Sequence, residues 1–244
     1  GRRQMLAVGL SGQLVYPVDK GSGSITTLAG ADGVIDIPSG VEYLEKGEKV
    51  EVELFSEMEP ADLVVAGENT LLLEKLAERV PWRIVLLNTG SVQARLYLED
   101  GVADLACICG PGAAAEGMKL IWSSKRELGL VFRDAGALSD PGRTHIVGWH
   151  RDFAMHAAFE QHLQALGLSH PKYVRLARTH SAVAAAVASG RADVGFAERR
   201  AAAQAGLGFR LLGHDEIKLL ARPKNVSDAR VKFLVSALSQ AGGA

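Results

Sequence analysis

Apolar and polar positions follow two different patterns along the chain, and the change falls near residue 58. Before it, short apolar runs alternate with turns rich in glycine and proline, and residues 50–54 alternate strictly between apolar and charged side chains, the period of a half-buried strand. Similar runs occur at 14–16 and 34–37, and only 24–29 could form a turn or two of helix. Residues 1–58 are therefore predicted to form a small all-β barrel whose core needs support from a neighbouring domain.

Residues 60–244 show the pattern of an α/β domain. Short apolar runs alternate with longer stretches of helical character, which is typical of βαβ units and parallel sheets. The predicted strands cover 63–66, 82–87, 103–108, 127–132, 145–147, 172–177, 193–196, 209–212 and 216–220, and the predicted helices cover 67–79, 88–99, 152–166, 181–188 and 228–240.

An internal repeat indicates that this α/β domain has two similar lobes. Residues 89–91 and 179–181 each read Thr-x-Ser, and each precedes a helix that ends in Gly-x-Ala-Asp and leads into a strand. The predicted first lobe covers about 60–110 together with the C-terminal helix, and the second covers about 125–215. A chance similarity between two alanine-rich helices is the alternative explanation.

Composition narrows the function classes. Apolar residues make up 48% and charged residues 23%, as in ordinary globular proteins. The 27 basic and 28 acidic residues give a net charge of −1, so no general attraction to nucleic acid or to an anionic membrane is expected. No apolar stretch is long enough to span a membrane, and no signal core follows Arg2 and Arg3, so a cytoplasmic protein is predicted. The missing initiator Met suggests a fragment or a trimmed product.

Motifs for catalysis and for metal binding are missing from the sequence. Cys107 and Cys109 would share one face of a strand and are interpreted as small core residues. His150, His156 and His162 are spaced by six and fall on different helix faces, so no metal site is predicted. No nucleophile elbow, P-loop or dinucleotide fingerprint occurs, and this chain alone is not predicted to be an enzyme.

Polar residues at strand–helix junctions are the candidate binding site. Ligands of parallel sheets bind beyond the carboxyl ends of the strands, where helix N-termini offer free N–H groups and a positive dipole. Such ends facing each other across a cleft could hold an anion without any dedicated cation, although Ser, Thr and Asn at these positions also act as ordinary helix caps. The candidate ligand residues are Glu68, Asn69, Thr70, Thr89, Ser91, Trp149, His150, Arg151, Thr179, His180 and Ser181.

Three residues near these junctions have open alternatives. Trp149 could offer a stacking face or could belong to the core, and Arg151 could bind a ligand or pair with a carboxylate. Glu198, which follows the strand at 193–196, could face the cleft or could be a solvated carboxylate at a helix start.

Residues 1–56 resemble the C-terminal β-barrel domain of MoeA-type molybdopterin molybdotransferases. The matching stretches are 1–3, 16–18, 21–28, 31–38 and 46–50. The family's catalytic domains lie upstream of this barrel, so the resemblance implies a cofactor-binding role toward molybdopterin only in combination with those domains. The residues with this conditional role are Arg3, Lys20, Ser22 and Ser24.

Residues 61–240 resemble the periplasmic-binding-protein-like domain (type II) found behind that barrel in MoeA relatives, and they are similar to the substrate-binding domains of LysR regulators. The matching motifs are residues 88–91 and 179–195. The family's Gly-Ser-Gly-Thr-Arg-like run is replaced here by residues 148–152, so the usual ligand contacts are altered.

Together these features predict the non-catalytic C-terminal portion of a MoeA-like protein of molybdenum cofactor biosynthesis. Its two-lobed module would bind a small anion, and the resemblance implies molybdate or tungstate, with no covalently bound cofactor. The expected partners are upstream MoeA-like domains or a separate MoeA-like chain, and a homodimer is a further possibility. The alternatives are a ligand-free scaffold for protein contacts and a cytoplasmic solute-sensing receptor. If the upstream domains belong to the same polypeptide, the parent protein is an enzyme.

Overall fold

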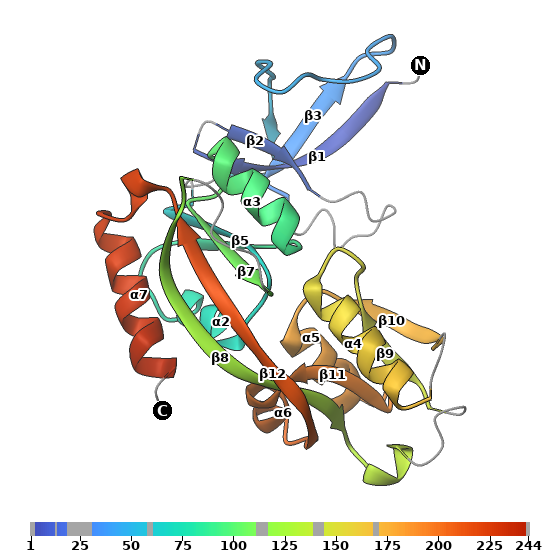
Figure 1. The fold of residues 1–244 in the computed structure, drawn as a ribbon. Helices are drawn as coiled ribbons and strands as arrows, with labels where there is room; N and C mark the ends of the chain where they lie inside the picture. Colours follow the sequence, from blue (N-terminus) through green and yellow to red (C-terminus); the bar gives the residue numbers. More distant parts are fainter. Residues whose placement is uncertain are drawn as a thin grey trace. The chain divides into compact units, whose positions relative to one another are not determined.

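The computed structural model describes residues 3–12, 14–18, 31–57, 61–110, 117–138, 144–167 and 171–242. The chain divides into two compact units, Gly1–Asp62 and Leu63–Ala244 (Figure 1).

The first unit is an antiparallel sheet of four strands in the order β2-β1-β3-β4. Among its described residues, Val8, Tyr16 and Ile35 are the buried apolar side chains, and the buried Asp32 carboxylate accepts a hydrogen bond from the Leu10 amide at 2.7 Å. The predicted all-β character is confirmed, although the strand at 50–54 is shorter than predicted. The strands are β1 (Gln4–Ser11), β2 (Leu14–Pro17), β3 (Gly33–Ile37) and β4 (Glu53–Leu54).

The second unit is built on one mixed sheet of eight strands in the order β10-β9-β11-β8-β12-β7-β5-β6. Its two central strands are antiparallel and 14 residues long, and three parallel strands flank them on each side. The strands are β5 (Leu63–Gly67), β6 (Ile84–Asn88), β7 (Leu105–Cys109), β8 (Lys119–Phe132), β9 (Ile146–Trp149), β10 (Tyr173–Ala177), β11 (Val194–Glu198) and β12 (Gly208–Ala221).

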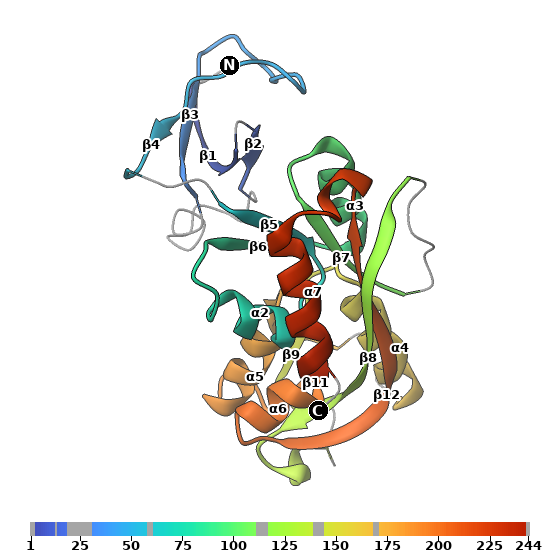
Figure 2. The same ribbon diagram turned by 90° about the vertical axis from the view of Figure 1, so that its left-hand side faces the viewer.

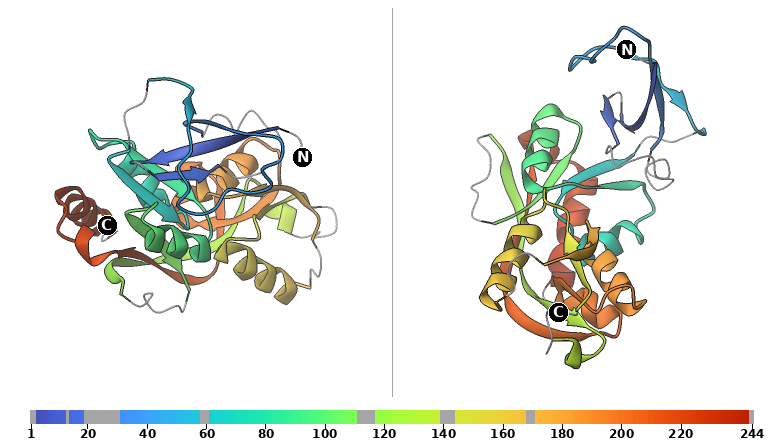
Figure 3. Two further views of the ribbon diagram at one scale, coloured as in Figure 1. Left: turned by 90° about the horizontal axis from the view of Figure 1, so that it is seen from above. Right: turned by 90° about the vertical axis from the view of Figure 1, so that its right-hand side faces the viewer.

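Helices gather at both ends of the long strands and define two lobes, as predicted (Figure 1). Lobe 1 combines β5, β6 and β7 with α2, α3 and α7, and α7 packs against α2 and β8 (Figure 2). Lobe 2 combines β9, β10 and β11 with α4, α5 and α6, which stay grouped in two further views (Figure 3). The helices are α2 (Leu71–Ala77), α3 (Ser91–Asp100), α4 (Ala154–Ala165), α5 (His180–Ala188), α6 (Arg199–Gln204) and α7 (Ala229–Gly242). None of the described helices is long and apolar enough to cross a membrane.

The long central strands correct two sequence predictions. The sequence pattern predicts separate strands at 209–212 and 216–220, but both belong to β12, which continues through a register shift between Leu211 and Gly213. The predicted strand at 127–132 is the second half of β8. Gly213, His214 and Asp215, which suggest a break between the two predicted strands, lie where β8 and β12 pass from one lobe to the other. Their pairing partners on β8 supply the backbone hydrogen bonds that a turn would otherwise provide.

Gly67 determines how the chain leaves β5. Its φ of +130° suits glycine, and a Cβ at this position would lie 1.9 Å from the carbonyl oxygen of Cys107 on β7. The next residue, Glu68, donates its N–H to the same carbonyl at 2.8 Å. The close approach of the two backbones therefore places the Glu68 side chain beyond the strand end.

Replacing Gly67 with alanine should destabilise the second unit more than the same replacement at Gly206. Gly206 also has a positive φ (+66°), but a Cβ there would meet nothing within 4 Å. Both variants lose about 1 kcal/mol or more from left-handed strain, and Gly67→Ala should lose a further 1–3 kcal/mol, approximately, from overpacking. Urea unfolding of the two variants measures the difference, and equal losses would contradict the close backbone contact.

Candidate functional site

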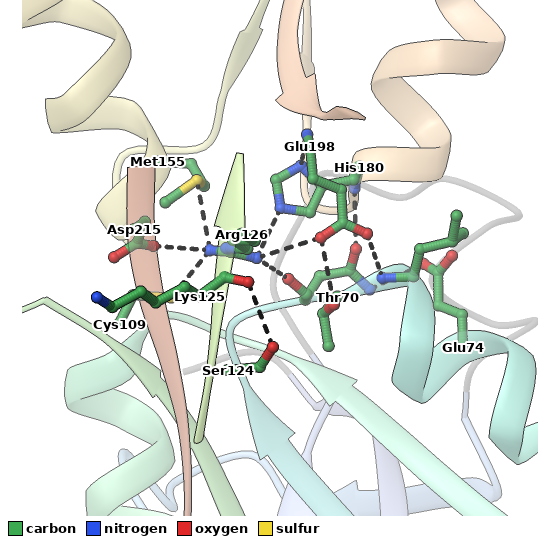
Figure 4. Close-up of polar contacts among 12 residues, drawn as sticks. Thr70, Glu74, Cys109, Ser124, Lys125, Arg126, Met155, His180, Glu198 and Asp215 are labelled. Atoms are coloured by element: carbon green, nitrogen blue, oxygen red, sulfur yellow. Dashed lines mark hydrogen bonds and ion pairs between the residues drawn. The ribbon is translucent and has the colours of Figure 1, made fainter. Parts of the chain in front are cut away.

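A buried arginine on the central strand β8 is surrounded by polar contacts (Figure 4). Arg126 on β8 pairs in register with Asp215 on β12, and its guanidinium Nη2 lies 3.0 Å from the Asp215 carboxylate. The same guanidinium donates from Nη1 to the carbonyl of Asn69 at 2.8 Å and from Nη2 to the sulfur of Cys109 at 3.0 Å. Although burial opposes the charged form, the nearby acidic groups hold the pKa of Arg126 above its ordinary value.

Glu198, the last residue of β11 in lobe 2, reaches across to the start of α2 in lobe 1. One carboxylate oxygen accepts the Leu71 amide at 2.7 Å, and the other accepts the Thr70 hydroxyl at 3.2 Å and lies 3.8 Å from Arg126 Nη1. Thr70 is the N-cap residue of α2, but its own side chain makes no capping bond. Glu198 therefore caps a helix of the opposite lobe, and its burial raises the pKa of its carboxyl group.

Glu68 holds helix ends from both lobes with a single oxygen. Its Oε1 accepts the Ser91 amide at 3.2 Å and the Ser91 hydroxyl at 2.9 Å, both at the start of α3. The same atom accepts the Ala154 amide at the start of α4 at 2.9 Å. The N-cap residues of these helices, Gly90 and Phe153, make no side-chain cap of their own, so Glu68 caps both.

The second oxygen of Glu68 differs from the first. Glu68 is only 2% exposed, and its Oε2 has no hydrogen-bond partner within the described part of the chain. Burial raises the pKa of this carboxyl group, although the donors at Oε1 favour the charged form.

A third contact joins the start of α5 in lobe 2 to lobe 1. The Asn69 side-chain oxygen accepts the His180 amide at 2.9 Å, and its amide nitrogen donates to Glu74 at 2.8 Å. The same Glu74 oxygen accepts the Ser181 hydroxyl at 2.8 Å. The polar junctions of the two lobes therefore face each other, as an anion site between them would require, but they are already hydrogen-bonded to each other.

The His180 ring is held neutral. Its Nδ1 accepts the Glu198 amide at 3.1 Å, and its Nε2 faces Arg126 Nη1 at 2.9 Å. A neutral imidazole accepts at one nitrogen and carries its proton on the other. Because an N–H donor faces each ring nitrogen of His180, one of these two contacts sets the ring N–H against another N–H. Burial and then the charge of Arg126 lower the pKa of His180 well below its usual value.

Three of the candidate ligand residues lie outside this cluster or do not face it. Trp149 is a core residue rather than a stacking face, because it is fully buried and its indole N–H donates to the Phe196 carbonyl at 2.8 Å. His150 lies 3.1 Å from the Asp152 carboxylate, and Arg151 is exposed.

The two candidate threonines near α3 and α5 differ in their hydrogen bonding. Thr179 accepts the Ala182 amide at 3.0 Å as the N-cap of α5, the ordinary role for such a residue. The Thr89 hydroxyl is buried without a partner among the described residues. In the first unit Arg3 forms an exposed bidentate pair with Asp36, whereas Lys20, Ser22 and Ser24 lie outside the described residues.

Arg126 and Asp215 are not among the predicted site residues, and Glu198 had two open interpretations. Lys125, Arg126 and Glu127 form a charged triplet that resembles a solvent-facing strand, so no local signal marks the buried member. The two cysteines are buried and free, as predicted, but Cys109 also accepts a hydrogen bond from Arg126. No group of three or more potential ligands that could hold a metal occurs in the described ranges.

The sheet of eight strands and its two groups of helices define a two-lobed α/β module. The family model described as the PBP superfamily domain matches residues 73–239, and the chain belongs to this superfamily. The model of the MoeA C-terminal region (domain IV) matches residues 1–55. Both predicted resemblances are thus confirmed.

Solved structures support the same fold. The bromide-bound regulatory domain of HypT from Salmonella typhimurium is 11% identical over 74% of this chain and 95% of that chain, with a TM-score of 0.53. The apo form of that domain gives 12% identity, the same coverages and a TM-score of 0.53. A point mutant of the same domain gives 10% identity over 75% of this chain and 98% of that chain, with a TM-score of 0.51. No curated protein matches the chain significantly.

Replacing Arg126 with methionine should destabilise the second unit by about 3–5 kcal/mol, because it leaves Glu198 and Asp215 buried without their cation. The matched control is Arg230→Met, which removes a partly exposed ion pair with Asp228 and should cost about 1 kcal/mol or less. Chemical unfolding followed by circular dichroism measures both. Equal losses would show that the central arginine does not compensate the buried carboxylates.

His180 should make the stability of the second unit depend on pH below about 6.5, the ordinary histidine pKa. The folded state holds the ring neutral, whereas the unfolded chain takes up a proton. The stability linked to His180 is therefore present above that pH and is lost as the pH falls, by at most about 1.4 kcal/mol per pH unit. His180→Asn should remove this part of the slope between pH 7 and pH 5, approximately, where histidine titrates. Parallel profiles for the two proteins would contradict a neutral buried ring.

Proposed function

We propose that residues 63–244 form a receptor for a small oxyanion within the non-catalytic C-terminal portion of a MoeA-like protein of molybdenum cofactor biosynthesis. The observation that carries this proposal is the convergence of three donors from two lobes on one oxygen of Glu68. An oxygen of a bound oxyanion would take the place of that carboxylate oxygen.

The chemistry of these donors suits an anion. Ser91 and Ala154 are the first residues of α3 and α4, so their amides lack intrahelical partners and lie at the positive ends of the helix dipoles. Each hydrogen bond to a charged ligand contributes about 1.5–3 kcal/mol. The Thr89 hydroxyl, buried and without a partner among the described residues, is a further donor beside Gly90.

The choice of molybdate or tungstate rests on the adjoining MoeA C-terminal region at residues 1–55. A domain of the same fold, that of HypT, has been solved with bromide bound, which is consistent with anion binding by this fold. Arg3 is the described residue with a conditional role toward molybdopterin, and Asp36 already pairs with it. Catalysis would therefore belong to upstream domains or to a separate MoeA-like chain.

A second candidate function, a ligand-free interaction module, is favoured by one observation. A Cβ on Gly90 of lobe 1 would lie 1.6 Å from the carbonyl oxygen of Asp152 of lobe 2, so the backbones of the lobes are in contact beside Glu68. A module that is closed in this way could serve as a scaffold without any ligand.

Titration calorimetry with molybdate, tungstate, sulfate and phosphate tests the receptor function. We expect heat of binding for at least one of these oxyanions and a loss of about tenfold or more in affinity for Ser91→Ala, which removes one hydroxyl donor to a charged ligand. The matched control is Ser189→Ala, because within the described ranges the Ser189 hydroxyl bonds only carbonyls at the end of its own helix α5. The absence of heat with every oxyanion at millimolar concentration would favour the scaffold.

A further inference from the structure

The position between the lobes where the three donors converge is occupied by a side chain of the protein itself, that of Glu68. We propose, on the basis of the function proposed above, that Glu68 is a built-in competitor for the ligand: its carboxylate fills the oxyanion position, and a ligand must expel it in order to bind. The donors that would hold a ligand oxygen are the ones that now hold Glu68 Oε1.

The space beside Glu68 makes the two occupants mutually exclusive. The cavity lined by Glu68, Asn69 and Asn88 measures about 10 Å³, which by the same measure is about the least that admits a single water molecule. The backbones at Gly90 and Asp152 are already in contact, so the lobes are closed beside Glu68. A tetrahedral oxyanion is larger than a water molecule, so it can reach these three donors in the closed module only by replacing the Glu68 carboxylate.

The hydrogen bonding of Glu68 shows why a ligand could replace it. Oε1 accepts three donors, but Oε2 is buried without a partner in the described part of the structure. A buried acceptor without a donor costs free energy. The donors around Oε1 all have an acceptor, whereas Glu68 keeps one buried oxygen without a donor.

The lobes do not depend on Glu68 alone for their contact. Arg126 binds the Asn69 carbonyl, and Glu198 caps α2, both independently of Glu68. Removal of the Glu68 carboxylate should therefore leave a closed module with an empty three-donor position, rather than two separated lobes. This position should accept an added anion.

The test compares the affinity of molybdate, and of formate as a minimal carboxylate, for four forms of the full chain: wild type, Glu68→Ala, Glu68→Gln and Glu99→Gln. Glu68→Ala should bind molybdate about 10- to 100-fold more tightly than the wild type, because the competent state no longer has to be made by expelling a side chain. Formate should raise the melting temperature of Glu68→Ala and leave that of the wild type unchanged.

Two of these variants control for poor folding of the alanine variant and for the change in net charge. Glu68→Gln keeps the size of the side chain and removes its charge, so it should bind molybdate with intermediate affinity even if the alanine variant folds poorly. Glu99→Gln makes the same change in net charge at an exposed position of α3 and should match the wild type.

The outcomes separate this inference from the proposed function. Equal molybdate affinities for wild type and both Glu68 variants would overturn the competitor role and leave the receptor function standing. Rescue of Glu68→Ala by formate without binding of any oxyanion would support Glu68 as the resident anion and would overturn the receptor function. If neither formate nor any of the four oxyanions affects the wild type or the Glu68 variants, both proposals are wrong.

Discussion

The buried charge of Arg126 is the constraint on which the second unit depends. A guanidinium this far from water is tolerated only when opposite charges and acceptors surround it. The two carboxylates come from different strands, Glu198 at the end of β11 and Asp215 on β12, and the carbonyl acceptor of Asn69 comes from the junction after β5. Neutralising one side chain therefore requires both lobes to meet at a defined distance.

The same requirement explains how the helix ends are satisfied. Helices α2, α3 and α4 have no side-chain caps from their own N-cap residues. Glu198 supplies the cap for α2, and Glu68 supplies it for α3 and α4. Because these caps cross between the lobes or join both of them, free N–H groups that would otherwise bind solvent or an anion become contacts between the lobes. The amides that the proposed receptor would use for a ligand are therefore the same ones that join the lobes through Glu68.

Much of the fold could be predicted from local patterns. The alternation of strands and helices, the repeat around residues 89–91 and 179–181, and the change near residue 58 all depend on neighbours in the sequence. Predictions failed where pairing over long distances decided the outcome: residues 209–212 and 216–220 form one strand because β8 pairs along the whole of it. Trp149 belongs to the core for the same kind of reason, since its N–H donates to β11, which is distant in the sequence.

The sequence by itself determined which polar residues would follow the strands at the helix starts, because strand ends and helix starts are local properties. That the junctions of the two lobes face each other was decided by the tertiary structure. The sequence did not determine what fills the space between the junctions. Burial of Arg126, the reach of Glu198 and the occupation of the donors by Glu68 depend on distances between residues far apart in the chain, which only the tertiary structure sets. The physical reason is that a charged side chain looks the same in the sequence whether it is solvated or buried, and only the surrounding atoms decide between the two.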